Sequence, residues 1–381
     1  MNPFVRTSFP FILFWALTGF AAHAALPLPP APQINARAWL LIDVSSGQPL
    51  AEKAADTRME PASLTKIMTA YLSFAALKDG RLKLDQTLPV SERAWQAEGS
   101  RTFLVPGRPA RVEDLLRGMI IQSGNDASIA LAEGIGGSEE GFVAMMNRTA
   151  QRLGMTNTHF TNATGLPHAQ HHSTARDLAR LTMAMIRDFP ERYKLYAEKD
   201  FAYNGIRQPN RNRLLYMDPS VDGVKTGHTG SAGYCLVASS QRDQRRLLSV
   251  VLGANSDVGR AMESQKLLNY GFQFYETVKL YPAGRTVSTL RIYKGADSAL
   301  RAGFGQDLYV TVPRGTAQRL KAQVVSRQPM LAPVRRGQAV GSLRLSLDGE
   351  RVGDFPLRAL HDIPVAGLLG RAWDSLLLLF R

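Results

Sequence analysis

The stretch Glu60–Lys78, EPASLTKIMTAYLSFAALK, places a serine and a lysine three residues apart at the start of a strongly helical run. Proline is tolerated in the first turn of a helix, so Pro61 marks the start and Leu64–Ala76 reads as helix. Residues three apart share one side of a helix, so Ser63 and Lys66 face the same way. The unpaired N–H groups and positive dipole end at such a start suit a developing oxyanion.

Two further short motifs occur once each. Ser123-Gly124-Asn125 falls between predicted helices over Val112–Ile121 and Asp126–Ala132, so we expect a tight turn whose polar side chains project into a cleft. Lys225-Thr226-Gly227 enters an apolar strand, where Gly227 lets a peptide backbone approach and pair along the strand. One such motif alone is close to chance. Together with the only S-x-x-K of the chain they predict one catalytic pocket.

Ser63 needs a base, because a serine hydroxyl is a weak nucleophile by itself. No Ser-His-Asp arrangement with a favourable context occurs, which leaves Lys66 as the candidate. Lys66 must be neutral near pH 7, against a pKa of about 10.4 in model peptides, and a shift of roughly three units costs about 4 kcal/mol. Burial and a second cation, Lys225, both act in that direction. We expect Ser123 to relay the proton to the departing amine.

These residues resemble the motifs of a known protein family. The three motifs match the signature of the penicillin-recognising serine enzymes. The stretches around them resemble the D-alanyl-D-alanine carboxypeptidases of the low-molecular-mass penicillin-binding protein 5 and 6 type, and the resemblance extends from Ala36 to the terminal helix. It is carried by the segments Glu60–Lys66, Ile121–Ala127, Ser173–Asp177, Asn204–Ile206, Asn210–Asn212 and Val221–Thr229.

The resemblance implies a serine-type hydrolase that removes the terminal D-alanine from peptidoglycan pentapeptides through an acyl-enzyme. Ser63 is then the nucleophile, Lys66 the general base and Ser123 the proton shuttle. No cofactor and no metal are implied, and β-lactams are the expected covalent inhibitors, which acylate Ser63 and leave slowly.

The resemblance also assigns the groups that hold the substrate. Asn125 binds the substrate amide, and the backbone N–H groups of Ser63 and His228 form an oxyanion hole. Lys225 supports the acidic end of the substrate electrostatically, and Thr226 and Arg211 help to bind the terminal carboxylate. The implied substrate-binding residues are Asn125, Arg211, Lys225, Thr226, Gly227 and His228.

Other activities stay open at this point. A β-lactamase shares the motifs, but no obvious E-x-x-x-N follows Asn125, and such enzymes lack a β-rich domain and a terminal anchor. A D,D-endopeptidase that cuts crosslinks is harder to separate. A non-catalytic wall-associated scaffold that binds penicillin need not retain the catalytic residues. The cluster His168, His171 and His172 could indicate zinc, but no H-E-x-x-H accompanies it.

The order of predicted elements indicates an α+β chain. We expect a β-lactamase/transpeptidase-like domain at residues 25–280, with an antiparallel sheet flanked by helices and a largely helical insertion. The hairpin over Ala38–Glu52 belongs to that sheet, as do strands over 234–239 and 246–252. Residues 281–362 predict a small all-β sandwich, because short β-rich runs alternate with turn residues. Those runs are residues 286–293, 307–312, 320–325 and 341–347.

The two ends of the chain predict an exported protein. Arg6, the apolar stretch Phe9–Ala22 and the following small residues read as a signal peptide at residues 1–24, cleaved before Ala25. Residues 363–381 read as an amphipathic helix that is too short and too charged to span a bilayer and fits the interface better. We therefore expect a periplasmic enzyme attached peripherally to the outer face of the inner membrane.

The charge of the chain limits the kinds of binding partner, and its cysteine content limits the kind of fold. The formal net charge is +14, but Lys and Arg are scattered along an exported chain, so nucleic acid is not the expected partner. Anionic lipid headgroups and wall polymer fit the basic surface better. The single cysteine, Cys235, excludes an intrachain disulfide framework.

Overall fold

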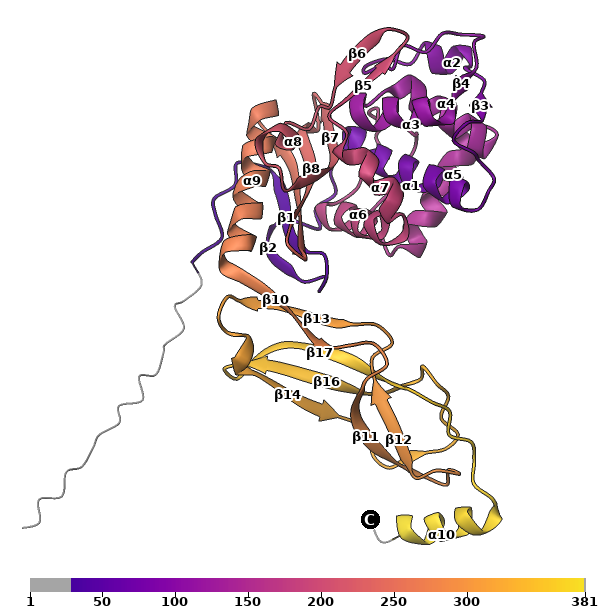
Figure 1. The fold of residues 1–381 in the computed structure, drawn as a ribbon, viewed down its shortest axis with the longest axis vertical. Coiled ribbons are helices and arrows are strands. Elements are labelled where there is room, and N and C mark those ends of the chain that lie inside the picture. Colours follow the sequence, from indigo (N-terminus) through magenta and orange to yellow (C-terminus); the bar gives the residue numbers. More distant parts are fainter. Residues whose placement is uncertain (1–28, 380–381) are drawn as a thin grey trace, which may run out of the picture.

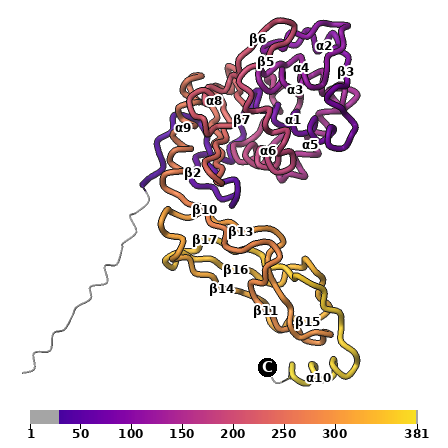
Figure 2. Tube along the Cα trace, in the orientation of Figure 1, coloured from indigo at the N-terminus to yellow at the C-terminus, as the bar shows by residue number. Residues whose placement is uncertain are grey.

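The structure is a computed structural model that describes residues 29–379, so the predicted signal peptide at residues 1–24 lies outside the described residues. The described part is elongated. Helices and one sheet form an N-terminal domain, a β-rich domain follows below it, and a short helix lies at the far end (Figure 1, Figure 2). The predicted α+β class with a separate all-β domain is confirmed.

The N-terminal domain is built on a five-stranded antiparallel sheet in the order β2-β1-β9-β8-β7. Alternate residues of a strand point to opposite faces, so both faces must be covered where the whole strand is apolar. In β1, Leu40 packs into the helical core that contains α1, whereas Leu41 packs against α9. The strands are β1 (Ala38–Asp43), β2 (Pro49–Lys53), β7 (Val221–Thr229), β8 (Gly233–Arg242) and β9 (Arg245–Ala254).

Helices cover both faces of this sheet. Helix α1 lies at the centre of the larger helical layer and is apolar on nearly every side, as expected of a core helix. The layer comprises η1 (Ala62–Thr65), α1 (Lys66–Lys78), α2 (Glu92–Trp95), α3 (Val112–Arg117), η2 (Gly118–Gln122), α4 (Asn125–Gly136), α5 (Glu139–Arg152), α6 (Ala175–Asp188), α7 (Pro190–Tyr193) and η3 (Lys194–Ala197). Helices α8 (Leu214–Met217) and α9 (Asp257–Phe274) contribute to the core on the other face, and two small hairpins complete the domain, β3 (Thr87–Leu88) with β4 (Ala110–Arg111) and β5 (Asp200–Tyr203) with β6 (Ile206–Pro209).

The β-rich domain has its own hydrophobic core. Its main sheet has the order β14-β16-β17-β12-β11-β15, and β10 pairs separately with β13. The elements are β10 (Tyr275–Tyr281), β11 (Thr286–Tyr293), β12 (Ala299–Gly303), β13 (Leu308–Pro313), η4 (Ala317–Arg319), β14 (Leu320–Val325), β15 (Met330–Leu331), β16 (Ala339–Leu347) and β17 (Glu350–Ala359).

The predicted runs at residues 286–293 and 320–325 match β11 and β14, but the sequence did not indicate β10, β12 or β17. Strand β17 carries Asp354, Pro356 and Arg358 and is nevertheless held between β16 and β12 by backbone pairing. Phe355, Leu357 and Ala359 do alternate towards the core, but a proline within such a run argues against a strand, so the sequence pattern is easily passed over.

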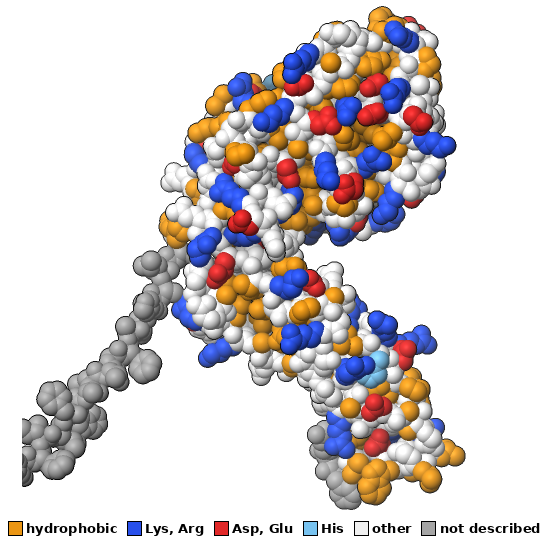
Figure 3. Space-filling model, viewed as in Figure 1, with side chains coloured by type: hydrophobic (Ala, Val, Ile, Leu, Met, Phe, Trp, Pro, Cys, Tyr) orange, Lys and Arg blue, Asp and Glu red, His pale blue; other side chains and the backbone are white. Residues whose placement is uncertain are grey.

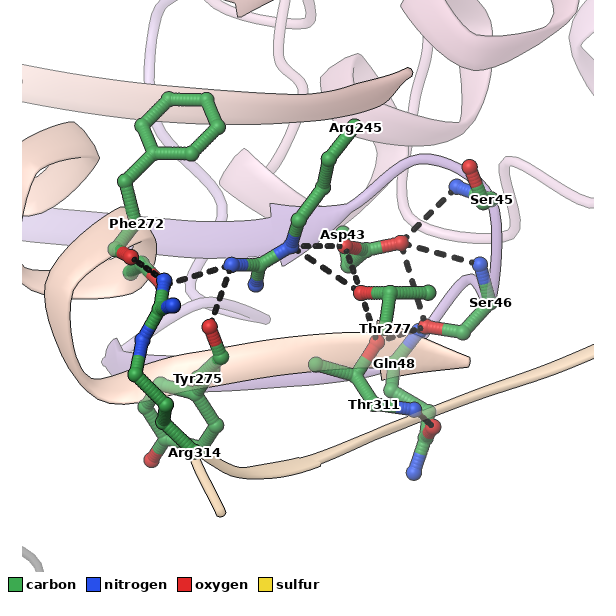
Figure 4. Close-up of polar contacts among 11 residues, drawn as sticks. Asp43, Ser45, Ser46, Gln48, Arg245, Phe272, Tyr275, Thr277, Thr311 and Arg314 are labelled. Atoms are coloured by element: carbon green, nitrogen blue, oxygen red, sulfur yellow. Dashed lines mark hydrogen bonds and ion pairs between the residues drawn. The ribbon is translucent and has the colours of Figure 1, made fainter. Parts of the chain in front are cut away.

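A buried carboxylate joins the two domains (Figure 4). Asp43, at the end of β1, has no exposed surface, and its carboxylate accepts hydrogen bonds from Arg245 Nε at 3.0 Å and Thr277 Oγ1 at 2.6 Å. Beside it, the hydroxyls of Ser46 and Thr311 lie 2.7 Å apart. Because Thr277 lies on β10 and Thr311 on β13, these bonds tie the β1–β2 turn to the first strand pair of the β domain.

The C-terminal helix α10 (Leu368–Leu378) begins a few residues after the predicted boundary at residue 363. Its Asp374 carboxylate accepts a hydrogen bond from the backbone N–H of Lys294, next to β11. Leu369 is 89% exposed and Trp373 is 64% exposed, so the apolar side chains face outward (Figure 3). Within residues 29–379, no helix is long and apolar enough to cross a membrane.

We expect Asp43→Ala to lower the free energy of unfolding by about 3–5 kcal/mol, because it leaves a largely buried arginine without its carboxylate. The matched control is Asp354→Ala, which removes a more exposed ion pair with Arg344 and should cost less than about 1 kcal/mol. Chemical denaturation followed by fluorescence measures both. Equal losses of unfolding free energy in the two variants would show that Asp43 stabilises the protein no more than a surface ion pair does.

Candidate active site

The serine and lysine of the first motif lie at the junction of η1 and α1. Lys66 is 1% exposed, and its Nζ lies 2.9 Å from Ser63 Oγ. The same Nζ donates to Asn125 Oδ1 and to the backbone carbonyl of Thr164, both at 2.6 Å. All three hydrogens of a lysine ammonium therefore have an acceptor, which keeps the side chain in one position.

The second motif forms a turn between η2 and α4. Ser123 adopts a left-handed conformation with φ of 70°, and its Oγ is buried without a hydrogen-bond partner among the described residues. Asn125 begins α4 and contacts Lys66 directly. The carboxylate of Asp126 accepts hydrogen bonds from the backbone N–H groups of Thr102 and Leu104, and so fixes the loop before α3 against this turn. A buried hydroxyl without a partner is uncommon, so the Ser123 side chain calls for a functional explanation.

The third motif lies on β7, the edge strand of the sheet, with one side unpaired. A Cβ atom at Gly227 would lie 2.9 Å from the Pro61 carbonyl oxygen and 3.2 Å from Ser63 N, so only glycine lets β7 approach η1 this closely. Lys225 is 2% exposed, and its Nζ donates to the Thr226 carbonyl at 3.1 Å. The structure thus brings all three motifs together.

Burial controls the charge of both lysines. It lowers the pKa of Lys66 to about 7, with a further lowering by the Arg211 guanidinium that the nearby Asp126 carboxylate opposes. Burial, followed by the charge of Lys66, holds the pKa of Lys225 well below its usual range. The sequence names Lys225 as the second cation near Lys66. The two lysine charges do oppose one another, since Lys66 lowers the pKa of Lys225, and Arg211 lowers the pKa of both lysines.

The motifs surround one cleft of about 1090 Å³. Arg211 lies at its exposed rim, where Nε is 3.5 Å from Gln122 Oε1. Of the predicted residues, Ser63, Ser123, Asn125, Arg211, Thr226, Gly227 and His228 line the cleft. Lys66 and Lys225 act from beneath this surface.

Sequence reasoning missed several groups at the cleft. Arg260, on α9, donates to the Gly227 carbonyl at 3.0 Å and also lines the cleft. The imidazole of His228 stacks on Tyr234 with ring centroids 4.1 Å apart, so neighbouring strands hold it in place. The Thr164 carbonyl is a backbone group, so its part in the site cannot be predicted from residue type. Arg260 had no motif around it that could have singled it out.

The histidine cluster does not form a metal centre in the described part of the chain. Among residues 29–379 no group of three or more His, Cys, Asp or Glu side chains is placed to hold a metal ion. His171 is buried and hydrogen-bonds Thr65, whereas His168 is exposed.

Comparison with known proteins assigns the fold and cleft to a class. Residues 25–256 match the family model of D-alanyl-D-alanine carboxypeptidases, and residues 275–365 match the C-terminal domain of penicillin-binding protein 5. The chain therefore belongs to the D-alanyl-D-alanine carboxypeptidase family, as the sequence motifs indicated.

Individual relatives are similar over almost their full length. The D-alanyl-D-alanine carboxypeptidase DacC of Escherichia coli (strain K12) is 45% identical over 379 residues, which is 97% of this chain and 94% of that protein. Penicillin-binding protein 5 from Haemophilus influenzae is 41% identical with a TM-score of 0.85, covering 88% of this chain and 99% of the other. Penicillin-binding protein D2 from Listeria monocytogenes, solved in a cefotaxime-bound form, is 32% identical with a TM-score of 0.60, over 64% of this chain and all of the other.

We expect the Lys66 amine to lose its proton near pH 7, because burial and Arg211 disfavour its charged form. It should be mostly neutral at pH 8 and mostly charged at pH 6. NMR of protein labelled with ¹³C at lysine Cε measures this titration, and Lys66→Ala identifies the resonance by its loss. A midpoint above pH 9 would contradict the environment described here.

Proposed function

We propose that this protein is a serine-type D-Ala-D-Ala carboxypeptidase that removes the terminal D-alanine from peptidoglycan pentapeptides. The observation that carries the proposal is the short contact between Lys66 Nζ and Ser63 Oγ, made by a lysine whose burial lowers its pKa to about 7. The names of the relatives support the same activity.

The acceptors around Lys66 favour one direction of proton transfer. The Asn125 and Thr164 oxygens can only accept, so they take the two N–H bonds of a neutral amine. The remaining lone pair then faces Ser63, whose hydroxyl can donate to it. We propose that Lys66 takes this proton as Ser63 Oγ attacks the carbonyl between the two D-alanines, which forms a tetrahedral intermediate.

The proposed oxyanion hole consists of the backbone N–H groups of Ser63 and His228. The close approach of Gly227 to Ser63 N supports it, because the two backbone segments are adjacent. The loss of one such donor typically costs about 3–4 kcal/mol of transition-state stabilisation. The unpaired Ser123 Oγ is proposed to pass the proton from Lys66 to the leaving D-alanine amine. Water then hydrolyses the acyl-enzyme.

The substrate peptide is proposed to lie along the free edge of β7 and to pair with its backbone. Asn125 Nδ2 donates one hydrogen to the Glu98 carbonyl, which leaves a second for a substrate carbonyl. Thr226 and Arg211 are proposed to bind the terminal carboxylate. Lys225 is proposed to support it electrostatically from below, because an incoming carboxylate favours the charged form of this buried lysine. Penicillins offer the same carbonyl and carboxylate, so we expect them to acylate Ser63.

Fluorescent penicillin tests the nucleophile. We expect stable covalent labelling of the parent protein and none of Ser63→Ala, because Ser63 carries the hydroxyl that is hydrogen-bonded to Lys66 Nζ. Ser138→Ala, which changes a helix cap in α5, is the matched control and should be labelled normally. A label that turns over rapidly would indicate a β-lactamase, and an unlabelled parent would indicate a scaffold.

The choice between peptidases needs a second substrate. Release of D-alanine from diacetyl-Lys-D-Ala-D-Ala, lost in Ser63→Ala, is expected of a carboxypeptidase. Cleavage of crosslinked wall peptides without such release would contradict the proposal and favour an endopeptidase.

We further propose that residues 1–24 direct export and that residues 363–381 attach the protein to the periplasmic face of the inner membrane. The expected bounds are residues 25–280 for the catalytic domain and 281–362 for the β sandwich, although β10 already pairs with β13 of the β domain from residue 275. The outward-facing apolar side chains of α10 support the attachment, since an exposed face of this kind lowers its free energy in a lipid interface.

Deletion of residues 368–381 should release the protein from membranes without loss of penicillin labelling, because the cleft lies in the other domain. Fractionation of cells followed by labelling measures both properties. The matched control Leu331→Ser changes an exposed apolar residue of the β domain and should leave the distribution unchanged. Unchanged membrane association after the deletion would contradict the proposed anchor.

A further inference from the structure

Residues 161–173, which we name the rear loop, form the later part of the connection between α5 and α6 and pack against the segment that carries Ser63. Thr164, Gly165 and Leu166 of this loop line the cleft. The Thr164 carbonyl accepts the hydrogen bond from Lys66, and the Ala163 carbonyl accepts one from Thr69 Oγ1 on α1 at 2.8 Å. The position of the rear loop therefore sets the surroundings of Lys66.

One buried histidine links this loop to the nucleophile helix. His171 is 2% exposed, and its Nε2 lies 2.8 Å from Thr65 Oγ1, between Ser63 and Lys66 in the sequence. Its Nδ1 accepts from the backbone N–H of Thr161 at 3.2 Å. Because a backbone N–H can only donate, Nδ1 carries the lone pair and Nε2 carries the proton of the neutral ring. His171 thus donates to Thr65 and accepts from Thr161.

The rear loop contacts the chain before Ser63 as well as after it, where Thr65 lies. Ser173 exchanges backbone hydrogen bonds with Met59, at 2.8 and 2.9 Å, four residues before Ser63. A Cβ atom at Gly165 would lie 1.8 Å from the Ala62 carbonyl oxygen, so the loop packs directly on the residue that precedes the nucleophile. Ala62 has φ of 48°, a conformation that L-residues rarely adopt and that surrounding contacts must maintain.

The ring needs to be neutral for this arrangement. Burial, and then the charges of His159, His168, His172 and Lys66, lower the pKa of His171 to about 4. The lone pair on Nδ1 is therefore available to Thr161 at neutral pH. A second proton on the ring would leave the Thr161 N–H facing another donor.

We propose that His171 is a positioning residue for acylation: its imidazole bridges Thr65 and Thr161 and so holds the Thr164 carbonyl on Lys66 and the Ser63 turn in its reactive geometry. This inference rests on the proposed function of the same cleft. It assigns a role to a group that touches neither substrate nor nucleophile. The simpler alternative is a core histidine that contributes only to folding.

The acylation step separates these two roles. Stopped-flow mixing of the purified full-length protein with fluorescent penicillin gives the dissociation constant of the non-covalent complex and the rate constant of acylation. We expect His171→Ala to lower the acylation rate constant between about 10- and 100-fold, as misplacement of reacting groups by about 1 Å does. The dissociation constant should change less than about twofold, because the side chain lies outside the cleft.

Two variants serve as comparison. His171→Gln keeps a donor and an acceptor, so it should recover most of the acylation rate. His159→Ala replaces an exposed histidine next to His172 and should acylate like the parent. A thermal shift in His171→Ala, together with a parental rate constant in its folded fraction, would overturn the proposal. Failure of the parent itself to be acylated would instead overturn the proposed function.

If His171→Ala does not fold, Thr65→Val tests the same hydrogen bond from its other end. It removes the hydroxyl that receives the His171 proton and keeps a similar shape. It should slow acylation in the same way as His171→Ala, because it breaks the same link. In this background His171→Gln should give no recovery, since the hydroxyl that would receive its hydrogen bond is gone. A parental rate in Thr65→Val, or a parental rate in the double variant, would contradict the bridge.

Discussion

The chemistry of this protein depends on one buried amine. Lys66 lies beneath the cleft where its charged form is disfavoured, yet each hydrogen of its ammonium has an oxygen acceptor. Burial favours the neutral amine, the charge of Arg211 acts in the same direction, and the Asp126 carboxylate opposes both. Together they bring the pKa to about 7, where the group can both take and return a proton.

Close backbone contacts make this balance possible. Gly227 brings β7 against Ser63, and Gly165 brings the rear loop against Ala62, at distances that any side chain would prevent. Ala62 and Ser123 both adopt left-handed backbone conformations. Such conformations cost about 1–3 kcal/mol each and persist only where the surroundings enforce them. The core of α1 and the sheet provide that support.

The sequence predicted the parts of the site that are encoded in side chains at fixed spacing. Ser63 and Lys66 follow from the helical period, and the turn at Ser123 and the strand at Lys225 follow from local residue types. The Thr164 carbonyl could not be predicted, because backbone groups carry no residue signature. Arg211 was assigned to the carboxylate of the substrate, and its effect on Lys66 depends on a tertiary distance. Strand β17 was missed because Pro356 interrupts its alternating apolar residues, and its pairing with β16 is visible only in the folded chain.

The open edge of β7 also affects how molecules of this protein behave towards one another. An unpaired strand edge is a template for self-association, and many proteins cover it or place charges along it. Here the edge borders a concave surface, between η1 on one side and the Arg211 segment on the other. A second folded molecule that added a strand here would have to insert it into the cleft beside η1. The concave surroundings of β7 therefore act against self-association through this edge, as a covered edge does in other proteins.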